Sequence, residues 1–262
     1  MQTALITGAS SGIGAVFAQE LAKQQTNLVL VARSEEKLNQ LADRLRQQYQ
    51  IQVEVLLADL TKPGANQEIC DRVSQKNITV DILINNAGFG DYGAFSDRPL
   101  QKQLEMIQLN ILALVELTHL FLPGMKHQKS GSIINVGSIA GFQPLPYMSV
   151  YAATKAFVLS FSEALWAENR EFNIRVQALC PGPTDTNFPN VAEFPNAMKF
   201  SGPQKLATPE QVVDQSLKAL AKNESTVVTG GFGNQLIVNI PRFLPRDTLV
   251  SAIEKQFNFS GN

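Results

Sequence analysis

Charged residues are scarce in this sequence, and they form no block of one sign. Lysine, arginine, aspartate and glutamate make up 17 % of the 262 residues, and the formal net charge is −1. Nothing here would neutralise a phosphate backbone, so we expect no nucleic-acid partner. Hydrophobic residues reach 44 %. This content excludes a disordered chain and suffices for one large domain with a substantial core.

Cysteines and long apolar runs are also rare. Cys70 and Cys180 lie far apart and form neither a metal-ligand pattern nor a disulfide framework. We therefore predict no metal site and a reducing, cytoplasmic compartment. The longest apolar run, 111–122, contains a glutamate and a histidine and is too short and too polar to span a bilayer. The N-terminus has no basic segment followed by an apolar one, so we expect neither a membrane partner nor a secretory signal.

What the sequence does contain is a regular alternation of short apolar runs and longer amphipathic ones. Seven apolar runs are typical of buried strands: 3–7, 27–32, 53–58, 80–85, 132–137, 174–179 and 225–230. Between them lie helical patterns such as 34–49, with leucines on one stripe. This alternation predicts an α/β fold, a single doubly wound parallel sheet with helices on both faces. We predict one domain over 1–262.

Two segments depart from the alternation. Residues 183–207 are rich in proline, asparagine and phenylalanine, which predicts a long irregular loop acting as a substrate lid. A helix is expected to restart at Thr208, because TPEQ is a capping box with proline at the first helical position. Residues 236–262 form a predicted C-terminal tail. Its final amphipathic helix has an apolar stripe without a cationic face, which favours packing over membrane anchoring.

A glycine-rich turn, TGASSGIG (7–14), follows the first predicted strand and opens a helix predicted to begin near Ala15. Glycines allow a tight turn and a close approach of the backbone to a pyrophosphate, and the helix N-terminus supplies free N–H groups. The position between the first strand and the first helix predicts a dinucleotide-binding loop. Its predicted cofactor-binding residues are Gly8, Ser10, Ser11, Gly12, Ile13 and Gly14.

The end of the second predicted strand bears on the choice between NAD and NADP. An acidic residue there would bind the adenosine ribose hydroxyls, but the sequence has Ala32, then Arg33 and Ser34. A guanidinium pairs well with a phosphate, so Arg33 and Ser34 are predicted to bind the 2′-phosphate of NADP (NADPH), with NAD disfavoured. The alternative is that Arg33 is a solvated charge at a strand end.

Taken together, several motifs resemble the short-chain dehydrogenase/reductase family in order and spacing over residues 1–186. They are the glycine-rich turn, NNAG (85–88), Asn110, Ser138, YAATK (151–155) and PGPTDT (181–186). The resemblance implies a Rossmann-type fold, hydride transfer between NAD(P) and a carbonyl or alcohol, and a homodimer or homotetramer. It also implies further cofactor-binding residues: Asp59, Leu60, Asn86, Ala87, Gly88, Tyr151, Lys155, Pro181, Gly182, Thr184 and Thr186.

The predicted catalytic residues are Asn110, Ser138, Tyr151 and Lys155. Residues four apart on a helix share a face, and a nearby ammonium lowers the pKa of a phenol from its ordinary value of about 10. Tyr151 is therefore the predicted proton donor, tuned by Lys155. Ser138 is predicted to hold the substrate oxygen. The resemblance suggests that the amide or backbone of Asn110 holds a water that links Lys155 to solvent.

The predicted substrate wall is mostly apolar and has few fixed charges. This favours a small-molecule partner, a lipophilic ketone or aldehyde, and hence an NADPH-dependent carbonyl reductase or alcohol dehydrogenase. One alternative is a 3-oxoacyl thioester reductase. Another is a non-catalytic NADP-binding sensor, although a sensor would not need the full catalytic set. The predicted substrate residues are Phe89, Ser138, Phe142, Gln143, Met148 and Phe188, with Phe194 and Phe200 from the lid.

Overall fold

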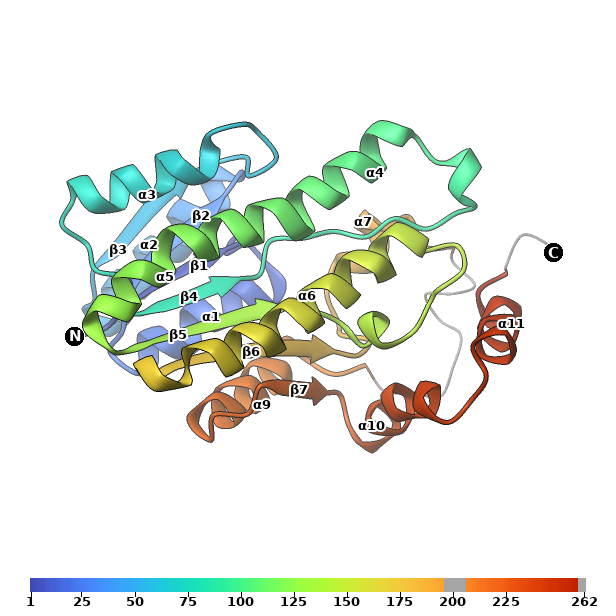
Figure 1. Ribbon diagram of the computed structural model, residues 1–262. Coiled ribbons are helices and arrows are strands. Elements are labelled where there is room, and N and C mark those ends of the chain that lie inside the picture. The colour runs from blue at the N-terminus through green and yellow to red at the C-terminus, as the bar shows by residue number, and fades with distance from the viewer. Residues whose placement is uncertain (196–205, 259–262) are drawn as a thin grey trace.

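The computed structural model describes residues 1–195 and 206–258 (Figure 1). It contains one seven-stranded sheet in the order β3-β2-β1-β4-β5-β6-β7, and every neighbouring pair of strands is parallel. The strands are β1 (Thr3–Thr7), β2 (Asn27–Ala32), β3 (Val53–Leu57), β4 (Ile82–Asn85), β5 (Gly131–Val136), β6 (Ile174–Pro181) and β7 (Thr226–Thr229). The predicted doubly wound parallel sheet is confirmed.

Helices cover both faces of the sheet, as Figure 1 shows, and this explains the continuous apolar strands. Successive residues of β1 alternate between two cores: Ala4 and Ile6 belong to one, and Leu5 belongs to the other. The first core is closed by α1 (Gly12–Lys23), α2 (Glu35–Tyr49) and α9 (Pro209–Ala221). The second is closed by α3 (Ala65–Gln75), α5 (Leu114–Gln128) and α6 (Ser149–Asn169).

The direction of winding reverses at β1, which lies between β2 and β4. In open α/β sheets, ligands bind outside the carboxyl ends of the strands at this reversal point, because the connections there run to opposite faces and leave a crevice. The glycine-rich turn leaves β1 at this edge, and the NNAG segment leaves β4 beside it. The sheet therefore brings two of the predicted cofactor motifs together.

One long helix differs from the sequence-based expectation. Helix α4 (Leu100–Ile107), a π-helical stretch (Gln108–Ala113) and α5 run on without a break, and this 29-residue helix is long and apolar enough to cross a membrane by length and composition. The prediction considered only an uninterrupted apolar run and so missed it. In the fold, the inward side of the helix is covered by packing, with Met106, Leu117 and Met125 buried.

Most of the predicted elements agree with the structure. Each predicted strand matches to within two residues at either end. The capping box is present: the Thr208 hydroxyl accepts from the Gln211 N–H at 3.2 Å, and the Gln211 side chain accepts from the Thr208 N–H at 3.1 Å. Helix α1, however, begins at Gly12 rather than near Ala15.

The C-terminal third contains elements that the prediction missed. A short helix, α7 (Phe188–Val191), lies in the segment expected to be irregular, and α10 (Phe232–Asn239) follows β7. The tail helix was predicted and corresponds to α11 (Arg246–Phe257). Short 3-10 turns complete the described chain: η1 (Phe95–Asp97), η3 (Ile139–Phe142), η4 (Arg170–Phe172) and η5 (Ile240–Arg242).

Candidate active site

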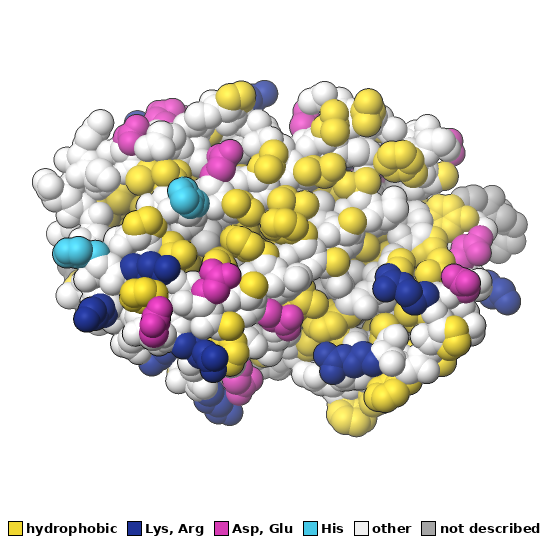
Figure 2. All heavy atoms as spheres, in the orientation of Figure 1, with side chains coloured by type: hydrophobic (Ala, Val, Ile, Leu, Met, Phe, Trp, Pro, Cys, Tyr) yellow, Lys and Arg dark blue, Asp and Glu magenta, His cyan; other side chains and the backbone are white. Residues whose placement is uncertain are grey.

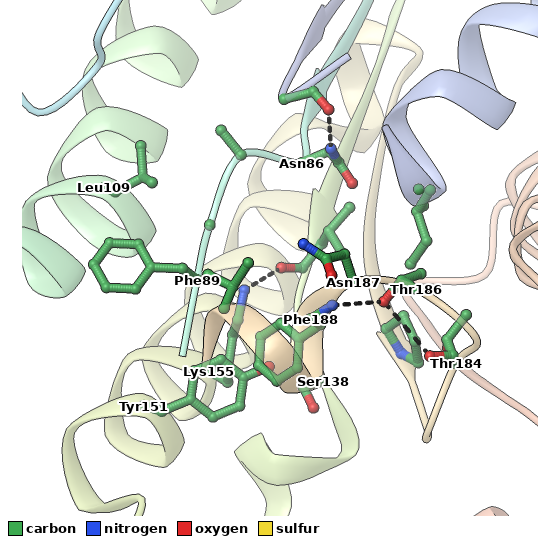
Figure 3. Close-up of a pocket in the computed structure, with 18 of the residues that line it drawn as sticks. Asn86, Phe89, Leu109, Ser138, Tyr151, Lys155, Thr184, Thr186, Asn187 and Phe188 are labelled. Carbon is green, nitrogen blue, oxygen red and sulfur yellow. Dashed lines mark hydrogen bonds between the residues drawn. The ribbon is translucent and has the colours of Figure 1, made fainter. Parts of the chain in front are cut away.

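A cavity of about 1100 Å³ opens at the carboxyl edge of the sheet. It runs from the glycine-rich turn after β1, past the ends of β4 and β5, to α7 and the last residue of α11. Figure 3 shows its centre, where Ser138, Tyr151 and Lys155 lie close to the ring of Phe188. All of the predicted cofactor-binding residues except Gly14 line this cavity.

The glycine-rich turn is shaped to bring backbone close to a ligand. Gly8 and Gly12 have φ angles of +64° and +54°, a left-handed conformation that residues with a Cβ rarely adopt. Gly14 differs from these two glycines because it does not line the cavity. A Cβ at Gly14 would lie 2.5 Å from the Gly8 carbonyl oxygen, so its missing side chain lets α1 pack against the turn. Ser11, Gly12 and the N-terminus of α1 then face the cavity.

Asn86 and Thr7 hold this turn in place. The Asn86 side chain donates to the carbonyls of Thr7 at 2.9 Å and Gly8 at 3.2 Å. In return, the Thr7 hydroxyl accepts from the N–H groups of Asn86 and Ala87, both at 3.0 Å. The segment after β4 therefore fixes the conformation of the turn after β1. Thr7 is the first residue of the glycine-rich motif, but sequence reasoning gave it no role of its own.

At the far end of the cavity, Arg33 and Ser34 are exposed and lie with Asp59 and Leu60 in the lining. Burial raises the pKa of the Asp59 carboxyl, but hydrogen bonds from the hydroxyl and N–H of Thr61, aided by the charge of Arg33, lower it overall. The carboxylate therefore stays ionised at neutral pH. The turn that contains Gly8 and Gly12, the N-terminus of α1 and the exposed guanidinium of Arg33 together fit a phosphorylated dinucleotide.

Three of the predicted catalytic residues come from two elements. Ser138 follows β5, and its hydroxyl accepts from the Ala140 N–H at 3.1 Å, which caps the turn η3. Tyr151 and Lys155 lie on the first two turns of α6 and are only 8 % and 6 % exposed. The Lys155 ammonium donates to the Val136 carbonyl at 2.8 Å. The structure thus brings all three side chains to one place in the cavity.

The predicted direction of the Tyr151 pKa is wrong for the protein without its cofactor. Burial raises this pKa to about 12, although a hydrogen bond with Ser138 acts in the opposite direction. Burial likewise lowers the pKa of Lys155 to about 8. Desolvation dominates because both side chains are enclosed and the ammonium binds a backbone carbonyl instead of the phenol. Tyr151 is therefore protonated at neutral pH, the state that a proton donor requires.

Asn110 lies in the π-helical stretch and does not line the cavity. Its amide donates to the Phe89 carbonyl at 3.0 Å and to the Thr154 hydroxyl at 3.1 Å, and its oxygen accepts from the Phe89 N–H at 3.1 Å. Both N–H donors of the amide are thus occupied within the protein, and its oxygen already accepts one hydrogen bond. Asn110 thereby positions the Phe89 segment. The water that its amide or backbone is predicted to hold for Lys155 stays a prediction.

The substrate end of the cavity is aromatic. Phe89, Gln143, Met148, Phe188 and Phe194 line it as predicted. Phe188 lies between two of its neighbours, with its ring centroid 5.3 Å from that of Tyr151 and 6.0 Å from that of Phe194. Leucines and a tail residue that the sequence did not single out complete this wall: Leu109, Leu145, Leu206 and Phe257.

Phe142, which was predicted to bind substrate, does not line this cavity. Phe142 ends the turn η3 and lines a neighbouring groove with Arg246 and Val250 of α11; this groove shares Gln143 and Leu145 with the cavity. Phe200 falls outside the described residues. The placement of Phe142 was not available from local sequence, since it depends on how the segment after β5 packs against α11.

Comparison with known proteins places these observations in a family. The sequence profile of the family described as short chain dehydrogenase matches residues 2–193. Very-long-chain 3-oxoacyl-CoA reductase of Anas platyrhynchos is 37 % identical over 198 residues, which cover 72 % of this chain but 62 % of that protein. A 7beta-hydroxysteroid dehydrogenase of Mediterraneibacter gnavus is 32 % identical over 231 residues, covering 86 % of this chain and 85 % of that protein. The chain thus matches less than two thirds of the first relative.

Solved structures show the same similarity over nearly the whole chain. A short-chain dehydrogenase from Sphingobium yanoikuyae in complex with NADPH has a TM-score of 0.82 and 34 % identity, covering 100 % of this chain and 96 % of that one. A bulky-bulky ketone specific alcohol dehydrogenase from Comamonas testosteroni has a TM-score of 0.78 and 33 % identity, covering 96 % and 94 %. The resemblance of the motifs therefore extends to the fold.

Proposed function

The chain belongs to the short-chain dehydrogenase/reductase family, and we propose that it is an NADPH-dependent carbonyl reductase acting on a lipophilic ketone or aldehyde, with the corresponding secondary or primary alcohol as the product. One observation carries this proposal. The phenol of Tyr151, kept protonated by burial, lies beside Ser138 in a cavity whose other wall is aromatic. Such a site combines a proton donor with a pocket for an apolar substrate.

The choice of NADPH is supported by the residues around the adenosine end. Backbone at Gly8 and Gly12 would hold the pyrophosphate, and Arg33 would pair with the 2′-phosphate. Among the similar structures, the Sphingobium enzyme is a complex with NADPH, and an alcohol dehydrogenase from Thermococcus sibiricus, 26 % identical with a TM-score of 0.76, is a complex with 5-hydroxy-NADP. When bound, the cofactor supplies the hydride, and the protein orients the substrate and moves the proton.

The protein's part in the reaction follows from the positions of three side chains. The hydroxyls of Ser138 and Tyr151 would both contact the carbonyl oxygen of the substrate, which develops negative charge as hydride reaches the carbon. Tyr151 then gives its proton to that oxygen, so the product is a neutral alcohol. Lys155 lies behind Tyr151, and its positive charge would stabilise the phenolate left by this step.

The charges around the cavity favour an uncharged substrate over a thioester on a phosphorylated carrier. In the described part of the chain, the cations lining the cavity are Arg33, Lys102 and Lys155. Lys155 lies beside Tyr151, and the Lys102 ammonium is held by Asp91 at 2.7 Å and Glu193 at 2.5 Å. Lys102 therefore has little charge to offer to a phosphate.

A 3-oxoacyl thioester reductase remains the second candidate function. It is supported by relatives such as the human very-long-chain 3-oxoacyl-CoA reductase, which is 34 % identical over 186 residues, covering 68 % of this chain and 58 % of that protein. A long acyl chain would also suit the aromatic wall, since both are apolar. The two candidate functions use the same catalytic residues. They differ only in whether a thioester and its carrier bind beyond the aromatic wall.

The test is a panel of carbonyl compounds with NADPH, monitored by loss of the reduced cofactor. The panel contains a bulky aryl ketone, a small aliphatic ketone and a 3-oxoacyl thioester, and Tyr151→Phe is the control for turnover at this site. We expect the highest kcat/KM with the aryl ketone. Preference for the thioester would favour the second candidate, and binding of NADPH without oxidation by any compound would favour a sensor.

We propose that the chain forms a homodimer or homotetramer, in a cytoplasmic compartment and without a membrane partner. Figure 2 shows apolar side chains gathered in the middle of the face that α5 and α6 form in Figure 1. Leu112 and Phe157 contribute to the exposed apolar surface, being 45 % and 40 % exposed. Both cysteines are free, which suits a reducing compartment. Light scattering measures the oligomeric state of the wild type and of Leu112→Glu. This variant should weaken the association between subunits.

A further inference from the structure

A buried carboxylate organises the segment between β4 and α4. The side chain of Asp91 is fully buried and is contacted by Arg98 through Nε at 2.7 Å and Nη2 at 2.6 Å. Lys102 Nζ at 2.7 Å and Gln103 Nε2 at 2.6 Å complete its surroundings. A buried carboxylate is stable only with such partners, so Arg98 and Lys102 are held in fixed positions.

Glu193 joins this cluster from a distant part of the chain. It follows α7, and its carboxylate accepts from Arg98 Nη2 at 2.6 Å and from Lys102 Nζ at 2.5 Å. Its side chain is 55 % exposed, whereas that of Asp91 is 0 % exposed. A backbone bond from the Tyr92 N–H to the Ala192 carbonyl, at 2.9 Å, runs beside the ion pairs. Residues 188–194 are thus attached to the segment that Asp91 has already fixed.

The attached segment carries two aromatic residues of the substrate wall. The ring of Phe188 lies against Tyr151, and a Cβ at Gly90 would come within 2.6 Å of the Phe188 ring. Phe188 is therefore wedged between Gly90 and the proton donor. Phe194 in turn packs edge-on against Tyr92, with ring centroids 5.9 Å apart. The position of this segment decides how much space lies beside the phenol of Tyr151.

The geometry points to Glu193 as a positioning residue that holds Phe188 against Tyr151 and so sets the size of carbonyl substrate that the cavity accepts. Helix α7 has only four residues, and a single helical turn is not stable by itself. The position of α7 must therefore come from tertiary contacts. Among these, the ion pairs of Glu193 are the contacts between charged groups. That the aromatic wall selects substrates by size rests on the proposed function. That Glu193 holds residues 188–194 in place does not.

The variant that tests the inference is Glu193→Gln, with Asp214→Asn as the matched control. Glutamine keeps the size of the side chain and removes its charge, while Arg98 and Lys102 stay paired with the buried Asp91. Asp214 also loses one exposed ion pair, with Lys218 at 2.7 Å, but on α9 and outside the cavity lining. Because an exposed ion pair is worth a factor of about 1.4 to 5 in an equilibrium constant, two pairs give about 2- to 30-fold.

The first readout is kinetic. We expect Glu193→Gln to raise the KM for a bulky aryl ketone by about 2- to 30-fold, with the KM for NADPH and the melting temperature matching those of Asp214→Asn. A small aliphatic ketone, which leaves the wall unfilled, should show a smaller change. An unaltered KM for the aryl ketone, or the same increase in Asp214→Asn, overturns the positioning role.

The second readout needs no turnover. Amide hydrogen exchange reports the backbone bonds of the attached segment, namely Tyr92 N–H to Ala192, Ala192 N–H to Phe188 and Phe194 N–H to Pro189. We expect faster exchange at these amides in Glu193→Gln and no change in Asp214→Asn. Faster exchange in a protein that reduces no carbonyl compound supports the attachment and refutes the proposed function. Unchanged exchange in an active reductase refutes the attachment alone.

Discussion

The ammonium of Lys155 lies 5.8 Å from the ring centroid of Tyr151 and donates its hydrogen bond to the Val136 carbonyl. The cation is thus close enough to stabilise a phenolate but does not contact the phenol directly. Burial keeps the pKa of Tyr151 at about 12 and that of Lys155 at about 8. In the protein without cofactor, the pair therefore rests as a neutral phenol beside a partly charged amine at slightly alkaline pH.

Tyr151→Phe should abolish reduction while leaving NADPH binding largely unchanged. The substitution keeps the ring that packs on Phe188 and removes only the acidic proton. General acid catalysis contributes about 10²- to 10⁴-fold, so kcat should fall by at least that factor. Single-turnover kinetics and cofactor titration measure the two effects separately. A variant that retains most of its activity would show that another group donates the proton.

The affinity for NADPH should fall as the pH rises through about 8, because Lys155 loses its proton there. The sign follows from burial: the ammonium form, which attracts the anionic cofactor, is present below this pKa and lost above it. The measurement is the Kd for NADPH by direct titration from pH 6 to 10, in wild type and in Lys155→Met. The variant should bind weakly at every pH and lack the step. A step of equal size in Lys155→Met would assign the titration to another group.

The same lowered pKa makes a prediction for stability. Between about 8 and the ordinary lysine value of 10.5, the unfolded chain binds a proton at Lys155 that the folded chain does not. The contribution of Lys155 to the free energy of unfolding therefore rises with pH across this window and is least favourable below it. Urea unfolding of wild type and Lys155→Met at pH 7 and pH 9 measures the difference. A smaller gain in the wild type than in the variant would contradict the assignment.

Features that depend on neighbouring residues could be predicted from the sequence. The seven strands, the glycine-rich turn and the capping box at Thr208 all express local periodicity or local turn chemistry, and the structure contains them. The spacing of Tyr151 and Lys155 on one helix is local in the same sense. Parallel pairing then brings the ends of β1, β4 and β5 to one edge, which is why the candidate site was largely predictable.

Features that depend on packing between distant segments could not be predicted. The partners of Asn110 and Glu193 lie far away in the chain, and no local pattern indicates them. The direction of the Tyr151 pKa depends on how deeply the phenol is buried, which only the folded structure gives. Phe142 was assigned to the wall by its proximity to Ser138 in the sequence, but it lines a neighbouring groove.

Helix α11 should stabilise the fold by packing beside the substrate end of the cavity. Leu249 and Ile253 are each 6 % exposed and pack in a cluster with Met148 and Tyr151, and the Tyr92 hydroxyl donates to the Phe257 carbonyl. Leu249→Ala should lower the free energy of unfolding by about 2–4 kcal/mol, the usual cost of a buried leucine. Deleting 245–262 should have a larger effect or change the oligomer.

The matched control for α11 is Leu244→Ala, because Leu244 precedes the helix and is 42 % exposed. This substitution should change the free energy of unfolding by no more than about 0.5 kcal/mol. Urea unfolding measures both variants. Equal effects, or co-sedimentation of the intact protein with anionic vesicles that Leu249→Ala abolishes, would indicate that α11 binds a lipid surface instead of the fold.

Arg33 should carry much of the preference for NADPH over NADH. Ala32 offers no carboxylate to the adenosine ribose, and the guanidinium of Arg33 is exposed at that end of the cavity. A hydrogen bond that involves a charged group is worth about 1.5–3 kcal/mol, which corresponds to about 10- to 150-fold in affinity. Solvent and salt will screen part of this, so the lower half of the range is expected.

Steady-state kinetics with both cofactors on wild type and Arg33→Ala test this assignment. The substitution should raise the KM for NADPH far more than the KM for NADH, and the difference should shrink at high salt because the contact is ionic. Arg44→Ala, at an exposed position of α2, controls for the loss of a surface cation and should affect neither cofactor. If both cofactors lose affinity equally, or if the wild type already prefers NADH, Arg33 is a solvated charge at the end of β2, and the 2′-phosphate finds its partner elsewhere.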